Sequence, residues 1–435
     1  MQRCPTTRDR YGGGMLQALR TFGRILARHW PALAAWYLGG EAAHQLLVQL
    51  AGFVGGLTTL GGLLLLPLAV AARLISYVAM YLTVQSSLRH RSPDRDGGHR
   101  QFAHATLTAI LPFSIFYAAW GMLDADLIEF FRIASSIALR DAGYDLEQLG
   151  DRGGIVAVGL LPVVVLVVAL AARLVLARFG ERLPSWTVAL AAYAELLWTF
   201  MLVTLVGQWW ARAQDWIAGR AGFIRLQDLG DWFAANIVPV AALWEASLWL
   251  FGIIVAAVVV PAAWLTVAGV IYGTSFDATP IVLRRIDGAP SGTASRLRKV
   301  VMRRFEELWA AVALVWRGGP VVFGCTALAY ALWAAAEGLG SRTVLQLIGG
   351  HETAFWSAFL PLILVAVATI AEPLRVAIIA TGFDAVIGRP EAAMGTRASG
   401  VDSEPGAPVG SRDLELERAV NAIGQHEDRK DDVGP

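Results

Sequence analysis

Residues 63–74 read LLLLPLAVAARL, and residues 160–174 read LLPVVVLVVALAARL. Each stretch is an apolar run that contains a proline and ends near an arginine. An α-helix needs about 20 apolar residues to cross the hydrocarbon core of a bilayer. The whole chain agrees, because 56% of its 435 residues are hydrophobic and only 16% are charged, whereas soluble proteins carry about 25% charged residues. The sequence therefore predicts an all-α, polytopic integral membrane protein with the lipid bilayer as its solvent.

Eight apolar runs have the length of a membrane span. They lie at 31–52, 57–84, 103–122, 153–177, 185–207, 246–273, 318–337 and 353–381. Arginine and lysine collect before the first run and in every second loop, and such residues favour the cytoplasmic side. We therefore expect a multi-pass protein of the plasma membrane with both termini in the cytoplasm. Residues 1–30 are expected to form a cytoplasmic amphipathic segment, and 31–385 the eight-helix domain.

Prolines recur at regular intervals in the even-numbered runs. They are Pro67, Pro162, Pro261 and Pro361, followed by AARL at 71–74, AARL at 171–174, AAWL at 262–265 and AEPL at 371–374. A fixed period is the sequence signature of a repeat, and a unit that crosses twice keeps one orientation. We expect four hairpin pseudo-repeats; the alternative is a chance recurrence of Leu, Ala and Pro in apolar sequence.

Ionisable residues inside the predicted spans are the candidate functional residues, because such groups are costly in a membrane. They are Glu41, His44, Arg73, Glu195 and Glu372. One hypothesis is that they line a path for a substrate or for protons. The other is that Glu41 and Arg73 neutralise each other as a buried structural pair, and that Glu372 pairs with Arg375 at i, i+3.

Two further expectations concern neighbours of these residues. Glu41, His44, Gln45 and Gln49 recur at helical spacing, so they form one polar stripe that must face other helices or water. Glu195 is expected to lack an arginine partner, because Trp264 stands where its own hairpin would carry the arginine of AARL. Arg173 lies close enough to the cytoplasmic end of its run to extend toward water.

Motifs of known chemistry are missing or incomplete. Glu41-Ala-Ala-His44 has the E-x-x-H spacing of di-iron sites, but the chain has no second E-x-x-H. It also has no phosphate-binding loop, no G-x-S-x-G elbow and no C-x-x-C pair. We therefore predict a protein that is not an enzyme and uses no metal or cofactor. An intramembrane transferase that depends on scattered residues is the remaining enzymatic alternative.

Three segments outside the spans have a recognisable pattern. The stretches 126–149 and 208–233 resemble amphipathic helices of the outer headgroup region, the second one with four tryptophans. From residue 386 the chain becomes rich in Gly, Pro, Ser and acidic residues, which predicts a disordered cytoplasmic tail over 386–435. Within it, 411–424 has the spacing of a short amphipathic helix that could bind a cytosolic or membrane protein partner.

These features favour a non-catalytic membrane accessory or scaffold protein. The alternative is a transporter-like protein for a small or lipidic substrate, linked to protons through mid-membrane glutamates, because burial disfavours the charged form of a carboxylate. The net charge of +1 gives no field that would attract nucleic acid. The arginine-rich, alanine-rich composition is typical of a GC-rich bacterial genome.

Overall fold

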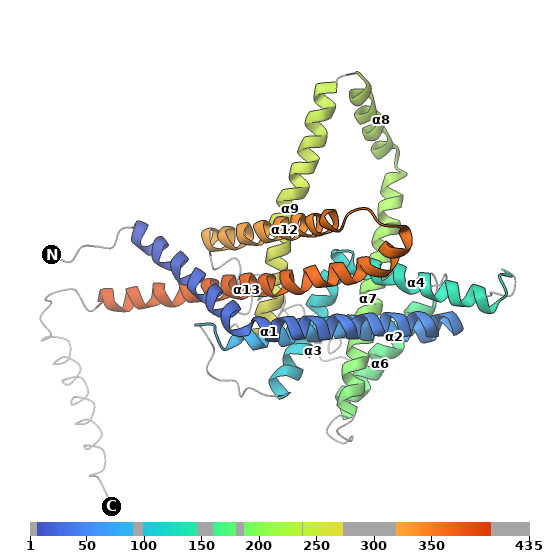
Figure 1. Cartoon of the computed structure of the whole chain (residues 1–435), viewed down its shortest axis with the longest axis horizontal. Coiled ribbons are helices and arrows are strands. Elements are labelled where there is room, and N and C mark those ends of the chain that lie inside the picture. Colours follow the sequence, from blue (N-terminus) through green and yellow to red (C-terminus); the bar gives the residue numbers. More distant parts are fainter. Residues whose placement is uncertain are drawn as a thin grey trace, which may run out of the picture. The chain divides into compact units, whose positions relative to one another are not determined.

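The computed structural model describes residues 7–89, 99–145, 160–179, 187–236, 238–272 and 319–401. These residues are almost entirely helical and contain no strand, which confirms the predicted all-α class. The helices, in chain order, are α1 (Thr7–Leu57), α2 (Thr59–Gln85), α3 (His99–Ala119), α4 (Met122–Asp141), α6 (Leu160–Phe179), α7 (Thr187–Ala218), α8 (Ala221–Asn236), α9 (Val238–Tyr272), α12 (Pro320–Ile348) and α13 (Thr353–Val401) (Figure 1). The chain divides into two compact units, Met1–Ile387 and Gly388–Pro435.

In the described part of the chain, six helices are long and apolar enough to cross a membrane. They are Thr59–Gln85, Gln101–Ala119, Ala189–Ala218, Ala242–Tyr272, Pro320–Ile348 and Thr353–Ile387. The chain is accordingly a membrane protein, and these helices match six of the eight predicted runs. The run at 31–52 is not among them, because Glu41, His44 and two glutamines lower its hydropathy. The run at 153–177 is described only from residue 160, and there Pro162–Leu176 forms a shorter apolar helix.

Several predicted boundaries differ from the helix ends. Helix α1 continues without a break past residue 30, and Pro31 lies inside it. Helix α13 continues to Val401, so the predicted start of the tail at 386 lies within a helix. The rest of the tail, including the segment 411–424, lies outside the described residues.

Helices α1 and α2 form an antiparallel hairpin joined at a single residue, Thr58. As residue numbers rise along α1, the residues that they contact on α2 have falling numbers, as expected for antiparallel helices. The His29 ring meets the Ser87 hydroxyl at 2.8 Å, Arg73 contacts Glu41, and the His44 ring meets the Ala69 carbonyl at 3.0 Å. The hairpin is tight at Gly40, where a Cβ atom would overlap the side chain of Ser76. A single-residue turn therefore places the polar stripe of α1 against α2.

Helix α4 packs along the second half of α1. A Cβ atom on Gly52 or Gly56 would lie 2.7 Å from the Cβ of Ile133 or Ile137, so both glycines are needed for the close approach. Because residues 52 and 56 meet 133 and 137 in the same order, the two helices run parallel. Phe130 on α4 is completely buried. The apolar face of the predicted headgroup helix is thus covered, at least in part, by α1.

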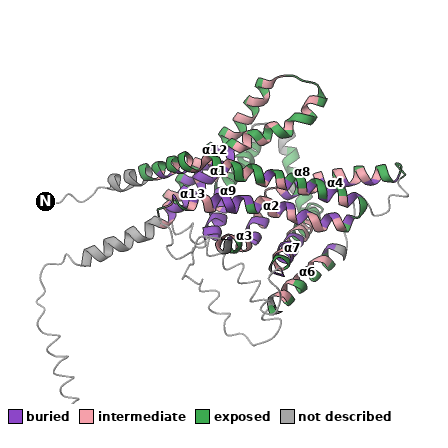
Figure 2. Ribbon diagram, turned by 60° about the horizontal axis from the view of Figure 1, so that its bottom comes forward, coloured by how far each residue is buried: buried purple, intermediate pink, exposed green. Residues whose placement is uncertain are grey.

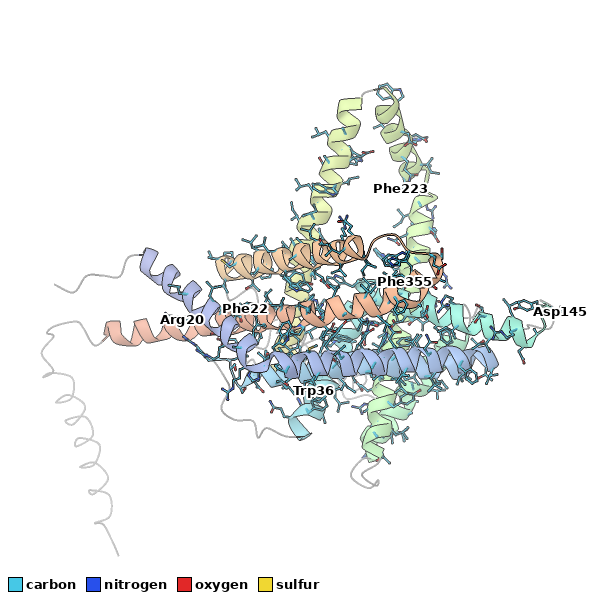
Figure 3. All side chains as sticks on the ribbon, viewed as in Figure 1. Arg20, Phe22, Trp36, Asp145, Phe223 and Phe355 are labelled. Carbon is cyan, nitrogen blue, oxygen red and sulfur yellow. The ribbon has the colours of Figure 1, made fainter. Side chains whose placement is uncertain are left out.

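Exposure is unequal along the chain. The hydrophobic core includes residues of α2, α3, the second half of α9 and α13, whereas residues 16–28 of α1 are mostly exposed (Figure 2). The predicted headgroup segment 208–233 is divided between the end of α7 and α8. Its four tryptophans are each more than half exposed, as is typical of residues that face lipid. Phe223, labelled in Figure 3, belongs to the same exposed segment.

Candidate functional site: a buried polar network

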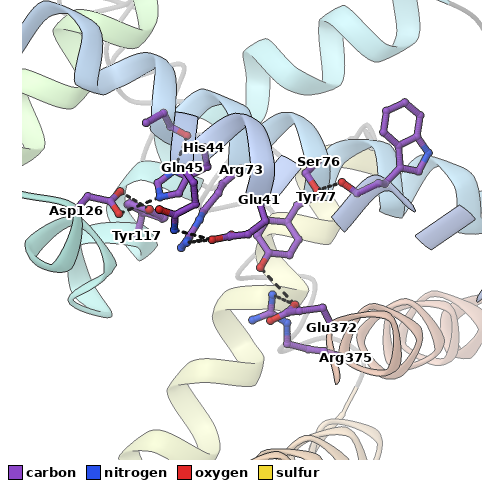
Figure 4. A network of polar contacts seen from close by, with 12 residues as sticks. Glu41, His44, Gln45, Arg73, Ser76, Tyr77, Tyr117, Asp126, Glu372 and Arg375 are labelled. Atoms are coloured by element: carbon purple, nitrogen blue, oxygen red, sulfur yellow. Dashed lines mark hydrogen bonds and ion pairs between the residues drawn. The ribbon is translucent and has the colours of Figure 1, made fainter. Parts of the chain in front are cut away.

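Glu41 is the centre of the first group of buried polar side chains (Figure 4). Arg73 of α2 contacts both carboxylate oxygens of Glu41 at 3.1 Å, and Gln45 donates to the same carboxylate at 3.0 Å. The guanidinium of Arg73 also lies over the ring of Tyr117 from α3, with Cζ 5.9 Å from the ring centroid. The ion pair between Glu41 and Arg73 that the sequence suggested is therefore present in the structure.

His44 lies beside this pair and contacts two acceptors. Its Nδ1 atom is 3.0 Å from the Ala69 carbonyl oxygen, and its Nε2 atom is 3.1 Å from Oδ1 of Asp126 on α4. The hydroxyl of Tyr117 donates to Oδ2 of Asp126 at 2.5 Å. Four helices, α1 to α4, thus meet through two polar groups that are neighbours on one face of α1.

Sequence reasoning missed Asp126 and Tyr117. Asp126 was included in an interfacial helix, although it stands one turn before Phe130 on the face that becomes buried. An acidic residue in register with an apolar face is the signal that could have identified it. Tyr117 gives no such signal, because a tyrosine near the end of an apolar run is common at membrane interfaces.

The remaining member of the α1 stripe also meets α4. Gln49 hydrogen-bonds to the side chain of Glu129, which in turn accepts 2.8 Å and 2.5 Å hydrogen bonds from Arg132. Arg132 holds the pKa of the Glu129 carboxyl below its ordinary value, chiefly through these hydrogen bonds. The stripe therefore faces α2 and α4.

A second group joins α2, α9, α12 and α13. Glu372 forms an ion pair with Arg375 one turn away and accepts a hydrogen bond from Tyr77 at 3.3 Å. The Arg375 guanidinium is surrounded by aromatic rings, with Cζ 4.0 Å from the ring centroid of Trp264, 5.0 Å from that of Tyr77 and 5.7 Å from that of Trp333. The ring of Trp264 on α9 therefore contacts the guanidinium of an arginine on another helix, α13.

Glu195 does have an arginine partner, contrary to the expectation from the sequence. Nε of Arg173 donates to Oε2 of Glu195 at 2.6 Å, across the contact between α6 and α7. The prediction failed because it considered only the arginine position of the hairpin that contains Glu195. The partner comes instead from the helix that precedes α7 in the sequence.

The two groups around Glu41 and Glu372 are close in space. Tyr37 of α1 lies within electrostatic range of both glutamates. Glu41 and His44, the two residues of the E-x-x-H motif, are engaged by different partners, which does not resemble a shared metal site. In the described part of the chain no three His, Cys, Asp or Glu residues come together as metal ligands would.

Charge balance is the common property of these contacts. Five carboxylates are buried in the described part of the chain. Four contact a basic side chain: Glu41 with Arg73, Asp126 with His44, Glu195 with Arg173 and Glu372 with Arg375. The fifth, Asp384, accepts a hydrogen bond from the backbone N–H of Arg89 at 3.0 Å.

No family model, curated protein or solved structure matches the chain. The function is therefore inferred from the geometry of the site alone.

Proposed function

We propose that this chain is a non-catalytic scaffold or accessory protein of the plasma membrane. The observation that carries the proposal is the pairing of its buried charges. A site that binds or moves a charged cargo needs a group whose partner is exchanged. Here fixed side chains occupy the four acid–base contacts, three of them between neighbouring helices and one within α13. Such pairs specify which helices meet and in what register.

The proposed topology has eight crossings, arranged as four hairpins with both termini in the cytoplasm. Helix α1 supplies the first crossing. Glu41 and His44 of its polar stripe are buried, whereas Gln45 and Gln49 are exposed but hydrogen-bond to Glu41 and Glu129. Leu46, Leu50 and Phe53 are also exposed and can face lipid. A helix of low average hydropathy can therefore lie in a bilayer, because its polar groups are satisfied within the protein.

The tail is the proposed binding element for a protein partner, through the segment 411–424. The test compares the full-length chain with a version that ends at Ile387, the last residue of the first compact unit. Both are purified from native membranes in mild detergent, and the co-purifying proteins are identified by mass spectrometry. The scaffold proposal expects a stoichiometric partner with the full-length chain and none with the shorter one. Two folded versions that both purify alone would contradict it.

One observation favours the transporter alternative. Among the described residues, the Tyr81 hydroxyl and the Nε atom of Arg375 are both buried and have no hydrogen-bond partner, and the two side chains interact electrostatically. Unsatisfied donors of this kind can mark a polar ligand site. Transport of a small polar molecule predicts that native mass spectrometry detects such a molecule on the wild-type protein. The same measurement on the Tyr81→Phe variant should show reduced occupancy; unchanged spectra would count against transport.

A further inference from the structure

Glu337 is an ionisable residue of a membrane helix that takes no part in the ion pairs described above. It lies on α12, within the candidate span Pro320–Ile348. Tyr330 and Trp333 precede it by seven and four positions, so the three side chains share one face of the helix. The two aromatic side chains are buried and Glu337 is half-buried. A carboxylate in such a place is costly in a membrane unless a cation compensates its charge.

The charges around Glu337 do not balance. Arg375 lies within electrostatic range of Glu337, but its guanidinium directly contacts Glu372. Two carboxylates therefore share one arginine. Arg342 of the same helix is five positions away, which is not a pairing distance on an α-helix. Among the described residues, no ion pair or hydrogen bond joins Glu337 to a basic side chain, so one negative charge is left unmatched.

Small residues flank Glu337 on the surface of α12. Ala334 and Gly338 are four positions apart, so they are neighbours along the helix surface, and both are exposed. A Cβ atom on Gly338 would meet nothing within 4 Å, and the same is true of Gly340. Small residues spaced in this way allow the backbone of a second membrane helix to approach closely.

We propose that the surface of α12 formed by Ala334, Glu337 and Gly338 docks a transmembrane helix of a partner protein that carries an arginine or a lysine. The small residues allow close packing, and Glu337 supplies the counter-charge for the basic residue at membrane depth. A symmetric contact with a second copy of this chain does not fit, because two Glu337 carboxylates would then repel each other. The inference rests on the proposed scaffold function and adds a second contact to the one assigned to the tail.

Two synthetic transmembrane peptides test this docking surface. Each is a helix of about 21 leucine and alanine residues, long enough to cross the bilayer, with either arginine or leucine at its centre. The full-length protein, with Cys4 changed to serine, carries an acceptor dye on Cys325, an exposed cysteine of α12, and is reconstituted in phosphatidylcholine vesicles. Energy transfer from donor-labelled peptide measures binding at constant lipid. We expect the arginine peptide to bind about tenfold more tightly than the leucine peptide.

Two variants and two matched controls assign the binding to this surface. Glu337→Gln keeps the size of the side chain but removes its charge, so the arginine peptide should bind no better than the leucine peptide. Gly338→Leu fills the docking surface from a position with no neighbour within 4 Å, so binding should fall while circular dichroism shows an unchanged helix content. The controls are Glu352→Gln, at an exposed carboxylate, and Gly252→Leu, at another open glycine. Both should bind like the wild type.

Equal binding of the two peptides by the wild-type protein would overturn the proposal and leave this surface of α12 in contact with lipid alone. A Glu337→Gln protein that still prefers the arginine peptide would also overturn it, because the counter-charge would then come from another residue. Neither result involves the tail. Failure of this surface is therefore distinguishable from failure of the scaffold function, which the comparison of full-length and shortened chains tests.

Discussion

Two arginines of this chain occupy the same local sequence, AARL, and lie in very different surroundings. Arg73 pairs with Glu41 inside a group that also includes Gln45, His44, Asp126 and Tyr117. Arg173 pairs with Glu195 across two helices, with Nε of Arg173 donating to Oε2 of Glu195 at 2.6 Å. The Arg73 side chain is 23% exposed and that of Arg173 29% exposed. The clear difference between them is that the group around Arg73 draws on four helices, α1 to α4.

The comparison shows how context decides what a repeated motif does. The first arginine helps to hold four helices together because α3 and α4 bring additional donors and acceptors to it. The second arginine joins α6 to α7. We therefore expect the stability of the protein to depend strongly on the first pair and weakly on the second.

The largest effect is expected for Glu41→Ala. The change leaves the Arg73 guanidinium largely buried without its anion and removes the acceptor of Gln45. Breaking a buried pair in this way costs about 3 kcal/mol. Denaturant unfolding in mild detergent, followed by circular dichroism, measures the loss. A decrease below about 1 kcal/mol, as is typical of surface pairs, would show that the group around Arg73 is not stabilising.

A somewhat smaller effect is expected for Gly40→Ala. The new methyl group would overlap Ser76, and overpacking of this kind costs about 2 kcal/mol. Gly39 is the matched control, since a Cβ at this neighbouring position would meet nothing within 4 Å. Gly39→Ala should be neutral or slightly stabilising, because alanine is the better helix former. Equal unfolding curves for the two variants would contradict the register of the hairpin.

Glu195→Ala is expected to cost about 1.5 kcal/mol, less than the ~3 kcal/mol typical of breaking a buried pair, although Glu195 is itself buried. Arg173 has fewer fixed neighbours than Arg73 and can extend toward water or headgroups once its partner is gone. The same unfolding assay, run beside Glu41→Ala, gives the ratio of the two effects. A loss as large as that of Glu41→Ala would mean that the two arginines are equivalent after all.

The smallest effect concerns pH and His29, at the open end of the hairpin and outside the six candidate spans. Burial, and secondarily the charge of Arg28, lowers the pKa of His29 below its ordinary value of 6.5. The unfolded chain then binds this proton more readily, so stability should fall slightly as the pH decreases below about 6.5. His29→Gln should lose this part of the pH dependence in thermal unfolding. A stability that rises as the pH is lowered through this range would have the wrong sign.

Part of this arrangement follows from the sequence. Apolar runs predicted the helical class and eight spans, six of which coincide with candidate membrane helices. The depth of Glu41 and Arg73 in neighbouring runs suggested the pair that the structure contains. Asp126 and Tyr117 were not predictable, because their roles depend on how α3 and α4 return to α1. The partner of Glu195 was predicted wrongly for a related reason: the contact between α6 and α7 is set by packing, and a recurring AARL sequence does not encode it.

The most direct test of this account is a double-mutant cycle on the first pair, with unfolding free energies of Glu41→Ala, Arg73→Ala and the double variant in the same membrane mimetic. A structural pair predicts that the double variant is more stable than the sum of the two single losses implies, with a coupling of about 2 kcal/mol. Strictly additive losses would show that Glu41 and Arg73 do not stabilise the fold through each other, and would contradict the central claim that buried ion pairs hold these helices together.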